Sequence, residues 1–102
     1  MRIDVVGRNI EVTEAIKQFS ESKLAKLPKY FDGTQQIVLA LSKDDHQKHG
    51  TFGAELRIDV EKHKDFILHA HGEDLYAVID QVAQKGAREL ADYKERLKTT
   101  KR

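Results

Sequence analysis

The last third of the chain, from Gly72 to Arg102, constrains the fold more than any other stretch. Apolar residues recur there at intervals of three and four, the spacing that forms one stripe along an α-helix. The stripe comprises Leu75, Val78, Ile79, Val82, Leu90, Tyr93 and Leu97. Asp74 precedes it as a plausible N-cap, since its carboxylate can accept from the backbone N–H groups of a first turn. We predict one long amphipathic helix that must lie on an apolar surface supplied by the rest of the chain.

The edges of this predicted helix are basic. On a helical wheel, Lys85, Arg88 and Arg96 line one flank of the stripe and Lys94 and Lys98 line the other. Gly86 falls in the middle of the stripe, where glycine costs about 1 kcal/mol relative to alanine. Either the glycine lets a second helix approach closely, or it leaves this helix softer.

The bulk composition excludes several classes of protein. The chain has 102 residues, enough for one domain with its own core, and it contains no cysteine. Disulfide scaffolds, cysteine nucleophiles and thiolate zinc sites are therefore excluded. No run approaches the ~18 apolar residues of a membrane span, and Asp4 interrupts the start where a secretory signal would stay apolar. We expect a cytoplasmic protein without membrane contact, one domain over residues 1–102, and a basic tail from about residue 97 that could be disordered.

Four shorter stretches show features of β-strands, with apolar residues at alternating positions. They span residues 2–8, 36–43, 52–61 and 66–71. A helix is predicted between the first two, with Thr13 as its N-cap and an end near Leu27. Pro28 breaks the hydrogen-bond ladder there but can open a short final turn through Tyr30. Its buried face is expected to contain Ile16, Phe19, Ser20, Leu24 and Leu27. The polar segment 43–51 is predicted to be a mobile loop.

The order is therefore strand, helix, three strands, helix. A helix between the first two strands favours parallel pairing through a right-handed crossover, whereas the later strands are close enough for hairpins. Both helices then cover the single apolar face of the sheet. The predicted fold class is α+β: a β-α-β-β-β-α two-layer sandwich with a four-stranded mixed sheet and two helices on one face.

No stretch of the sequence resembles a catalytic site. The serines lack a glycine-flanked elbow, and neither a phosphate-binding glycine loop nor a dinucleotide fingerprint is present. His69 and His71 fall on one face of a strand, a spacing that metal sites use. Without an evident third ligand, solvent-facing strand positions are the favoured interpretation. We expect no enzyme activity, no cofactor, no metal and no small-molecule substrate.

Basic residues gather on the two predicted helices, although the net charge is only +1. One interpretation is an ordinary solvated surface with i,i+4 ion pairs, each worth a few tenths of a kcal/mol. The other is an array that binds the phosphates of folded RNA without reading bases. Lys23 falls among the apolar positions of the first helix. Its stem could snorkel there, or its ammonium could be held at a ligand-facing seam between helices.

Three segments resemble the ribosome hibernation promoting factors, a family also called ribosome-associated inhibitor, protein Y or sigma modulation proteins. They are residues 7–16 (GRNIEVTEAI), residues 23–32 with their KLAKL and YFD motifs, and residues 72–80 (GEDLYAVID). The match spans nearly the whole chain in the right order, which makes it specific. The chain has the length of the short form, because the long form adds a C-terminal dimerisation domain.

The resemblance implies a non-enzymatic translation inhibitor that occupies the messenger and transfer RNA channel of the small ribosomal subunit in stress or stationary phase. The expected partner is 16S ribosomal RNA in 70S or paired inactive ribosomes, and the chain is expected to be a monomer off the ribosome. The candidate RNA-binding residues are Arg8, Lys23, Lys26, Lys29, Lys85, Arg88 and Lys94. Asp92 stands where relatives often carry a lysine, which weakens this array.

Two other functions stay open on the sequence. The β-β-β-α portion also resembles double-stranded RNA-binding modules, so the chain could bind RNA outside the ribosome. Alternatively, the exposed sheet face, with Val38, Ile67 and the histidines, could bind a protein such as a sigma factor.

Overall fold

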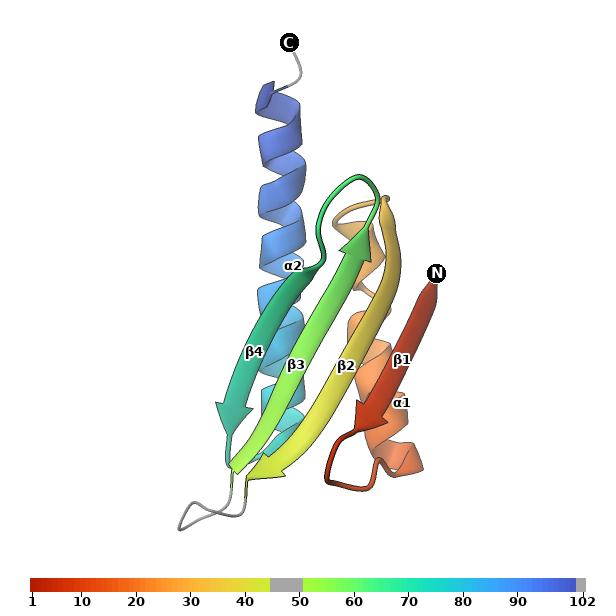
Figure 1. Cartoon of the computed structure of the whole chain (residues 1–102), viewed down its shortest axis with the longest axis vertical. Coiled ribbons are helices and arrows are strands. Elements are labelled where there is room, and N and C mark those ends of the chain that lie inside the picture. The colour runs from red at the N-terminus through yellow and green to blue at the C-terminus, as the bar shows by residue number, and fades with distance from the viewer. Residues whose placement is uncertain (45–50, 101–102) are drawn as a thin grey trace.

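The computed structural model describes residues 1–44 and 51–100. Its elements, in chain order, are β1 (Arg2–Gly7), α1 (Glu14–Leu24), the short 3₁₀ helix η1 (Leu27–Lys29), β2 (Thr34–Asp44), β3 (Thr51–Val60), β4 (Phe66–Gly72) and α2 (Leu75–Thr100). The strands form one sheet in the order β1-β2-β3-β4 (Figure 1). β1 pairs with β2 in parallel, and the other two pairs are antiparallel. The predicted α+β fold and its mixed four-stranded sheet are confirmed.

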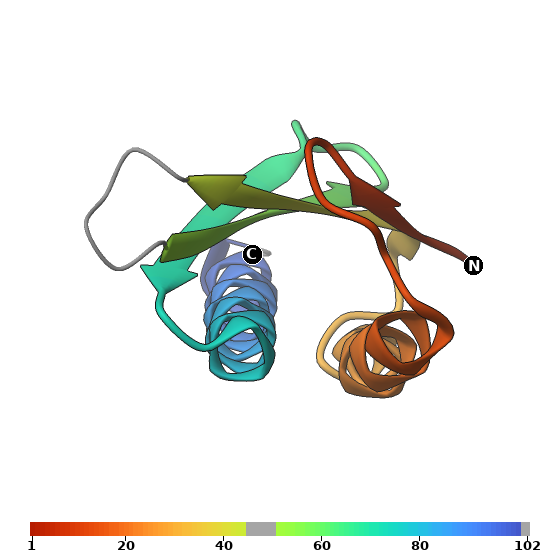
Figure 2. The same ribbon diagram turned by 90° about the horizontal axis from the view of Figure 1, so that it is seen from below.

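Both helices lie on the same face of the sheet (Figure 2). α2 packs against β3 and β4, and α1 packs against β1. Leu39 on β2, Leu56 on β3 and Ala70 on β4 are buried in one cluster with the apolar stripe of α2. The predicted inward residues of the edge strand β1, Ile3 and Val5, are only partly buried. Among residues 1–44 and 51–100, no helix covers the other face of the sheet, which is open to solvent (Figure 2).

Side-chain caps fix where both helices begin. The Thr13 hydroxyl accepts a hydrogen bond from the Ile16 backbone N–H at 3.2 Å. The Asp74 carboxylate accepts one from the Tyr76 N–H at 3.0 Å. Each bond satisfies an N–H group that the first helical turn leaves without an intrahelical partner. Both predicted N-caps are confirmed, and the two helices begin at the same end of the domain and run in the same direction (Figure 1).

The first helix is shorter than predicted. α1 ends at Leu24, with Ala25 as its C-cap, and so stops three residues before the predicted end near Leu27. Pro28 lacks a backbone N–H and disfavours helical geometry at the residue before it. The chain therefore tightens into the separate 3₁₀ helix η1, which the Tyr30 N–H closes by donating to the Leu27 carbonyl at 3.0 Å.

β2 is longer than predicted, since it begins at Thr34 and ends at Asp44, whereas β3 is shifted one residue earlier and spans Thr51–Val60. Their antiparallel pairing continues to Asp44 opposite Thr51, so residues 43, 44 and 51 of the predicted loop belong to strands. Residues 45–50, and with them the prediction of mobility, lie outside the described part of the chain. At the other end, α2 continues through Thr100, and Leu97 packs against the core.

Gly86 lies where α2 meets the sheet. A Cβ placed on this residue would lie 2.8 Å from Cδ2 of Leu56 and 3.2 Å from Cδ1 of Ile58, both on β3. The Leu27 side chain of η1 would be 3.6 Å away, an ordinary contact distance. The glycine thus permits a close approach, which was the first of the two interpretations of Gly86. The close partner, however, is the sheet and not the other helix.

Aromatic rings close the end of the core where η1 and the turn between β3 and β4 meet α2. The Tyr93 ring packs edge-on against Phe31 and Phe66, with centroid distances of 5.1 and 5.3 Å. The His63 imidazole stacks on Phe66 with 4.6 Å between centroids. Pairs of aromatic rings in such arrangements contribute about 0.5–1.5 kcal/mol beyond their buried area. This cluster fixes η1, and hence the position of Tyr30, relative to α2.

One polar side chain is buried in the middle of α1. Ser20 is fully buried, as predicted, and its hydroxyl has no hydrogen-bond partner within the described residues. Leu24 and Leu27 are buried beside it in the predicted face, whereas Ile16 and Phe19 are only half-buried. An unsatisfied buried hydroxyl costs roughly 1–3 kcal/mol, so Ser20 destabilises the packing of α1.

Candidate nucleic-acid interface

The groove between α1 with η1 and α2, called here the interhelical groove, collects polar and aromatic residues of the helix side. Because the two helices run in the same direction, its residues pair in sequence order. Phe19 packs edge-on against Tyr76 with 4.9 Å between ring centroids. One turn further on, the Lys23 ammonium lies 3.2 Å from the Asp80 carboxylate. Beyond this pair the groove opens into a hollow of about 170 Å³.

The position of Lys23 decides between its two interpretations. The ammonium does not escape at the edge of the helix, because Asp80 of α2 holds it in the groove and the Phe19 ring lies 5.4 Å from it. Asp80 also accepts a hydrogen bond from the Gln84 side-chain amide at 2.9 Å. Lys23, Asp80 and Gln84 therefore form one polar network that joins the two helices, and Lys23 is largely neutralised by its partner.

The hollow beyond this network has small residues on one wall and an aromatic ring on another. Ala83 and Ala87, four residues apart on α2, leave the space open. Tyr30, at the end of η1, lines it and keeps 43% of its surface exposed. The full set of residues around the hollow is Lys23, Lys26, Leu27, Tyr30, Asp80, Ala83, Gln84 and Ala87.

Four of the candidate RNA-binding residues, all exposed and on the helix side, have neither an ion-pair partner nor a side-chain hydrogen bond within residues 1–44 and 51–98. They are Lys26, Lys29, Arg88 and Lys94. Their charges meet only solvent, so an approaching phosphate would not have to break an existing ion pair. These residues are the strongest candidates for contacts to an anionic polymer.

Lys85 has a structural contact of its own. Its ammonium donates a hydrogen bond at 2.7 Å to the backbone carbonyl of His69. β4 is an edge strand of the sheet, so this carbonyl belongs to a row of backbone groups that no further strand covers. Together with Arg88, Gln81 and Leu68, Lys85 lines a second, larger hollow of about 400 Å³ between α2 and the edge of the sheet.

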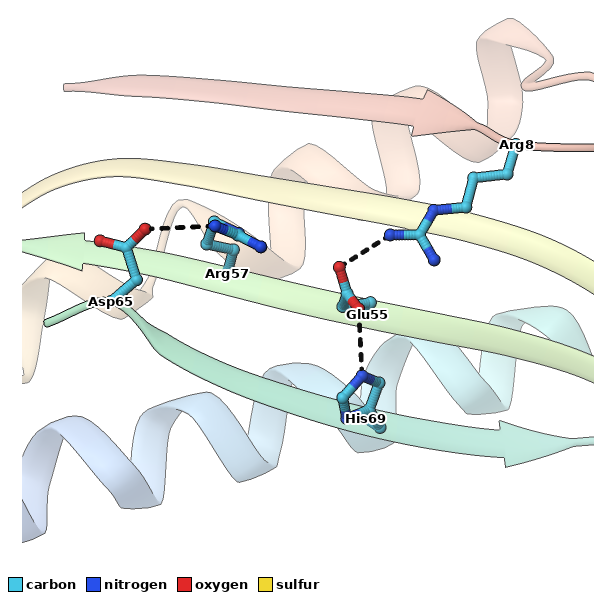
Figure 3. Close-up of polar contacts among 5 residues, drawn as sticks. All are labelled: Arg8, Glu55, Arg57, Asp65 and His69. Carbon is cyan, nitrogen blue, oxygen red and sulfur yellow. Dashed lines mark hydrogen bonds and ion pairs between the residues drawn. The ribbon is translucent and has the colours of Figure 1, made fainter.

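Arg8 lies on the other side of the molecule. Its guanidinium donates to the Glu55 carboxylate at 2.7 Å on the open face of the sheet (Figure 3). Glu55 also meets the His69 imidazole at 3.1 Å. The hydrogen bond from His69, followed by that from Arg8, lowers the pKa of Glu55 below its ordinary value. The structure therefore separates Arg8 from the basic residues of the helices.

The other six candidate residues all belong to the helix side, where they form two groups and one outlying residue. Lys23, Lys26 and Lys29 follow the interhelical groove, and Lys85 and Arg88 follow the opposite flank of α2 beside β4. Lys94 lies about two turns beyond Arg88 on α2. The candidate cations of both helices therefore lie on one side of the domain, and Arg8 lies on the other.

Sequence reasoning missed Asp80, Gln84 and Tyr30 as parts of this site. Asp80 and Gln84 are four residues apart on the same flank as Ala83 and Ala87, and that pattern of polar and small residues is a signal for an open groove. From the sequence, Tyr30 could be recognised only as the last residue of a helical turn. Its exposure depends on the direction of η1 relative to α1, which the sequence does not reveal.

The described residues offer no centre for a metal ion. Over 1–44 and 51–100, no group of three or more histidine, cysteine, aspartate or glutamate side chains is placed to bind one. His69 is instead engaged by Glu55. Neither helix in this part of the chain combines the length and the apolar run needed to cross a bilayer.

Comparison with known proteins identifies a family of ribosome-associated proteins. The family model described as "Sigma 54 modulation protein / S30EA ribosomal protein" matches residues 3–98. The ribosome hibernation promoting factor of Escherichia coli (strain K12) is 36% identical over 103 residues, covering 96% of this chain and 98% of that protein. The ribosome hibernation promotion factor of Lactococcus lactis subsp. cremoris (strain MG1363) is 30% identical, covering 95% of this chain but only 51% of its own length.

Solved structures show the same fold. The N-terminal domain of Thermus thermophilus protein Y superposes with a TM-score of 0.78 at 28% identity, covering 91% of this chain and 99% of that domain. A ribosomal subunit interface protein from Coxiella burnetii superposes with a TM-score of 0.82, covering 93% of this chain and 99% of that one. Its identity of 18% supports the fold alone.

Proposed function

Because this chain belongs to the Sigma 54 modulation protein / S30EA ribosomal protein family, we propose that it is a ribosome-binding hibernation factor of the cytoplasm. It binds the small subunit through its helix side and occupies the channel of messenger and transfer RNA in stress or stationary phase. The family is one of hibernation factors and not of enzymes, so the activity is steric occupation, with 16S ribosomal RNA as the surface that is bound.

The observation that carries this proposal is the contrast in charge pairing between the two sides of the domain. On the open sheet face the arginines are paired: Arg2 with Asp4 at 3.0 Å, Arg8 with Glu55 at 2.7 Å, and Arg57 with Asp65 at 3.6 Å (Figure 3 shows the last two). On the helix side, the four basic residues named above have no such partner. Phosphates gain most from cations that are not already neutralised, so the helix side is the RNA-binding side.

The shape of the domain suits insertion between RNA strands. α2 has 26 residues, a length of about 39 Å at ~1.5 Å per residue. The whole domain measures 52 × 25 × 19 Å. Basic groups follow both flanks of α2, with Lys26 and Lys29 across the groove on one side and Arg88 on the other. A helix with cations on both flanks can contact two RNA backbones at once and fill the space between them.

Co-sedimentation with ribosomes on a sucrose gradient tests this function. The variant is Lys29→Glu with Arg88→Glu, which reverses charge on both flanks of α2. Lys85 is left intact, because its contact with the His69 carbonyl stabilises the edge of the sheet. The control, Lys62→Glu with Lys64→Glu, makes the same change in net charge in the turn between β3 and β4 (Figure 1).

We expect the first double variant to leave the ribosome fraction and the control to remain in it, with unchanged circular dichroism for both. Removing one cation that binds a phosphate should reduce the slope of log affinity against log salt by about 1. Equal sedimentation of the two variants would refute this docking side. Equal affinity of the wild type for a plain RNA duplex and for vacant small subunits would instead favour a general duplex-binding module. Retention of a protein partner in nuclease-treated lysate would favour a protein-interaction module.

A further inference from the structure

We propose that the hollow of the interhelical groove binds one unpaired RNA base, stacked on Tyr30. This inference rests on the RNA binding proposed above and adds a site for a base to a surface otherwise described by phosphate contacts. The first observation is the size of the hollow. Its volume of about 170 Å³ is well below the roughly 300–1,000 Å³ of sites that enclose a drug-sized ligand. A single planar ring system suits such a space, and a whole nucleotide does not.

The aromatic wall is held in place before any ligand arrives. The Tyr30 N–H is bonded to the Leu27 carbonyl, and the next residue, Phe31, packs against Tyr93 of α2. The Tyr30 ring nevertheless remains 43% exposed, and its hydroxyl has no partner within the described residues. Exposed aromatic rings beside basic grooves are the surfaces on which single-stranded bases stack.

The apolar and polar walls complete a site for a base. Ala83, Ala87 and Leu27 provide apolar surface. At one end, the Asp80 carboxylate accepts from Lys23 and from Gln84. A carboxylate has about four acceptor positions, so two remain for a ligand. This end of the hollow therefore favours a base edge that donates N–H groups, as the amino groups of adenine, cytosine and guanine do.

The same network explains why an acidic residue is tolerated in a basic groove. An unpaired Asp80 would repel the RNA backbone, but the ammonium of Lys23 lies 3.2 Å away and neutralises it. Lys26 lines the hollow and Lys29 is one turn further along η1, and neither has an acidic partner within the described residues. Lys23 therefore supports the site for the base, whereas Lys26 and Lys29 bind the phosphates on either side of it.

The chain contains a matched control for Tyr30. Tyr76 is also 43% exposed and also lies along the interhelical groove. Its ring, however, packs edge-on against Phe19 and does not line the hollow. Replacing either tyrosine by alanine removes an exposed phenol ring from the groove, but only Tyr30→Ala removes the proposed stacking surface.

The experiment compares two RNA hairpins with the full chain. One hairpin carries a single bulged 2-aminopurine, whose fluorescence is quenched on stacking, and the other has the same stem without the bulge. The wild type, Tyr30→Phe and Tyr76→Ala should quench the fluorescence and bind the bulged hairpin about tenfold more tightly than the paired one. Tyr30→Ala should lose both the quenching and the preference, and keep the affinity for the paired hairpin.

Two results would overturn the inference: equal affinity of the wild type for both hairpins, or quenching that persists in Tyr30→Ala. Ribosome co-sedimentation of the wild type, measured in parallel, separates the two proposals. If the wild type travels with ribosomes but shows no preference for the bulged hairpin, the base site is wrong and the ribosomal function stands. If it prefers the bulged hairpin but does not travel with ribosomes, the base site stands and the ribosomal function is wrong.

Discussion

Replacing Gly86 by alanine sets helix propensity against packing in the core. Alanine is favoured over glycine by about 1 kcal/mol in a helix interior. Its Cβ would lie 2.8 Å from Cδ2 of Leu56, about 0.7 Å closer than the ~3.5 Å at which two carbons attract. Leu56 and Ile58 are fully buried, so neither can move into solvent. Overpacking of a filled core costs about 1–3 kcal/mol, and we expect Gly86→Ala to lower the free energy of unfolding by roughly 1 kcal/mol.

The measurement is urea denaturation followed by far-ultraviolet circular dichroism. The variants Gln81→Ala and Gln81→Gly, at an exposed position of the same helix, give the propensity difference alone. Leu56→Val removes the atom that the new Cβ meets, so Gly86→Ala should be less destabilising in that background by about 1 kcal/mol. The reasoning would be refuted if Gly86→Ala raised the free energy of unfolding by as much as the difference between Gln81→Ala and Gln81→Gly. In that case the contact of the new Cβ with β3 would impose no cost.

Two further predictions concern single groups. Ser20→Ala should raise the free energy of unfolding by about 1 kcal/mol, because it removes a buried hydroxyl without a partner among the described residues; a thermal melt that is unchanged or lower would contradict this. The hydrogen bonds from His69 and Arg8 lower the pKa of Glu55 below 4.5, the value of the unfolded chain. The carboxylate therefore stabilises the fold at pH values above 4.5, and this contribution is lost as the pH falls through the lowered pKa. The stability advantage of the wild type over Glu55→Gln should therefore hold at pH 7 and disappear in acid, and an advantage that is the same at pH 7 and pH 3 would count against it.

Local chemistry made most of the fold predictable. The caps Thr13 and Asp74 act within three residues of themselves, and the alternation of β3 or the stripe of α2 needs only neighbouring positions to be recognised. The end of α1 was less predictable, because Pro28 marks where a helix must stop but does not say that it stops earlier. The boundaries of the loop between β2 and β3 were also hard to predict, because they depend on how far the two strands continue to pair.

The candidate site was less accessible to sequence reasoning because its contacts join distant segments. Lys23 meets Asp80 across 57 positions, and Arg8 meets Glu55 across 47. A basic residue at the end of a strand can turn toward either face of a sheet, and only the position of its partner decides which. Sequence periodicity could place cations along a helix, but it could not show which of them were already neutralised.

The uncovered side of the sheet offers an attachment point for a reporter. The chain contains no cysteine, so Ile67→Cys would introduce its sole thiol. Ile67 is 48% exposed on β4, on the side of the sheet away from both helices. A fluorescent dye coupled there would leave the helix side unobstructed and would signal the arrival of a large partner through slower tumbling, so docking could be followed in real time by anisotropy.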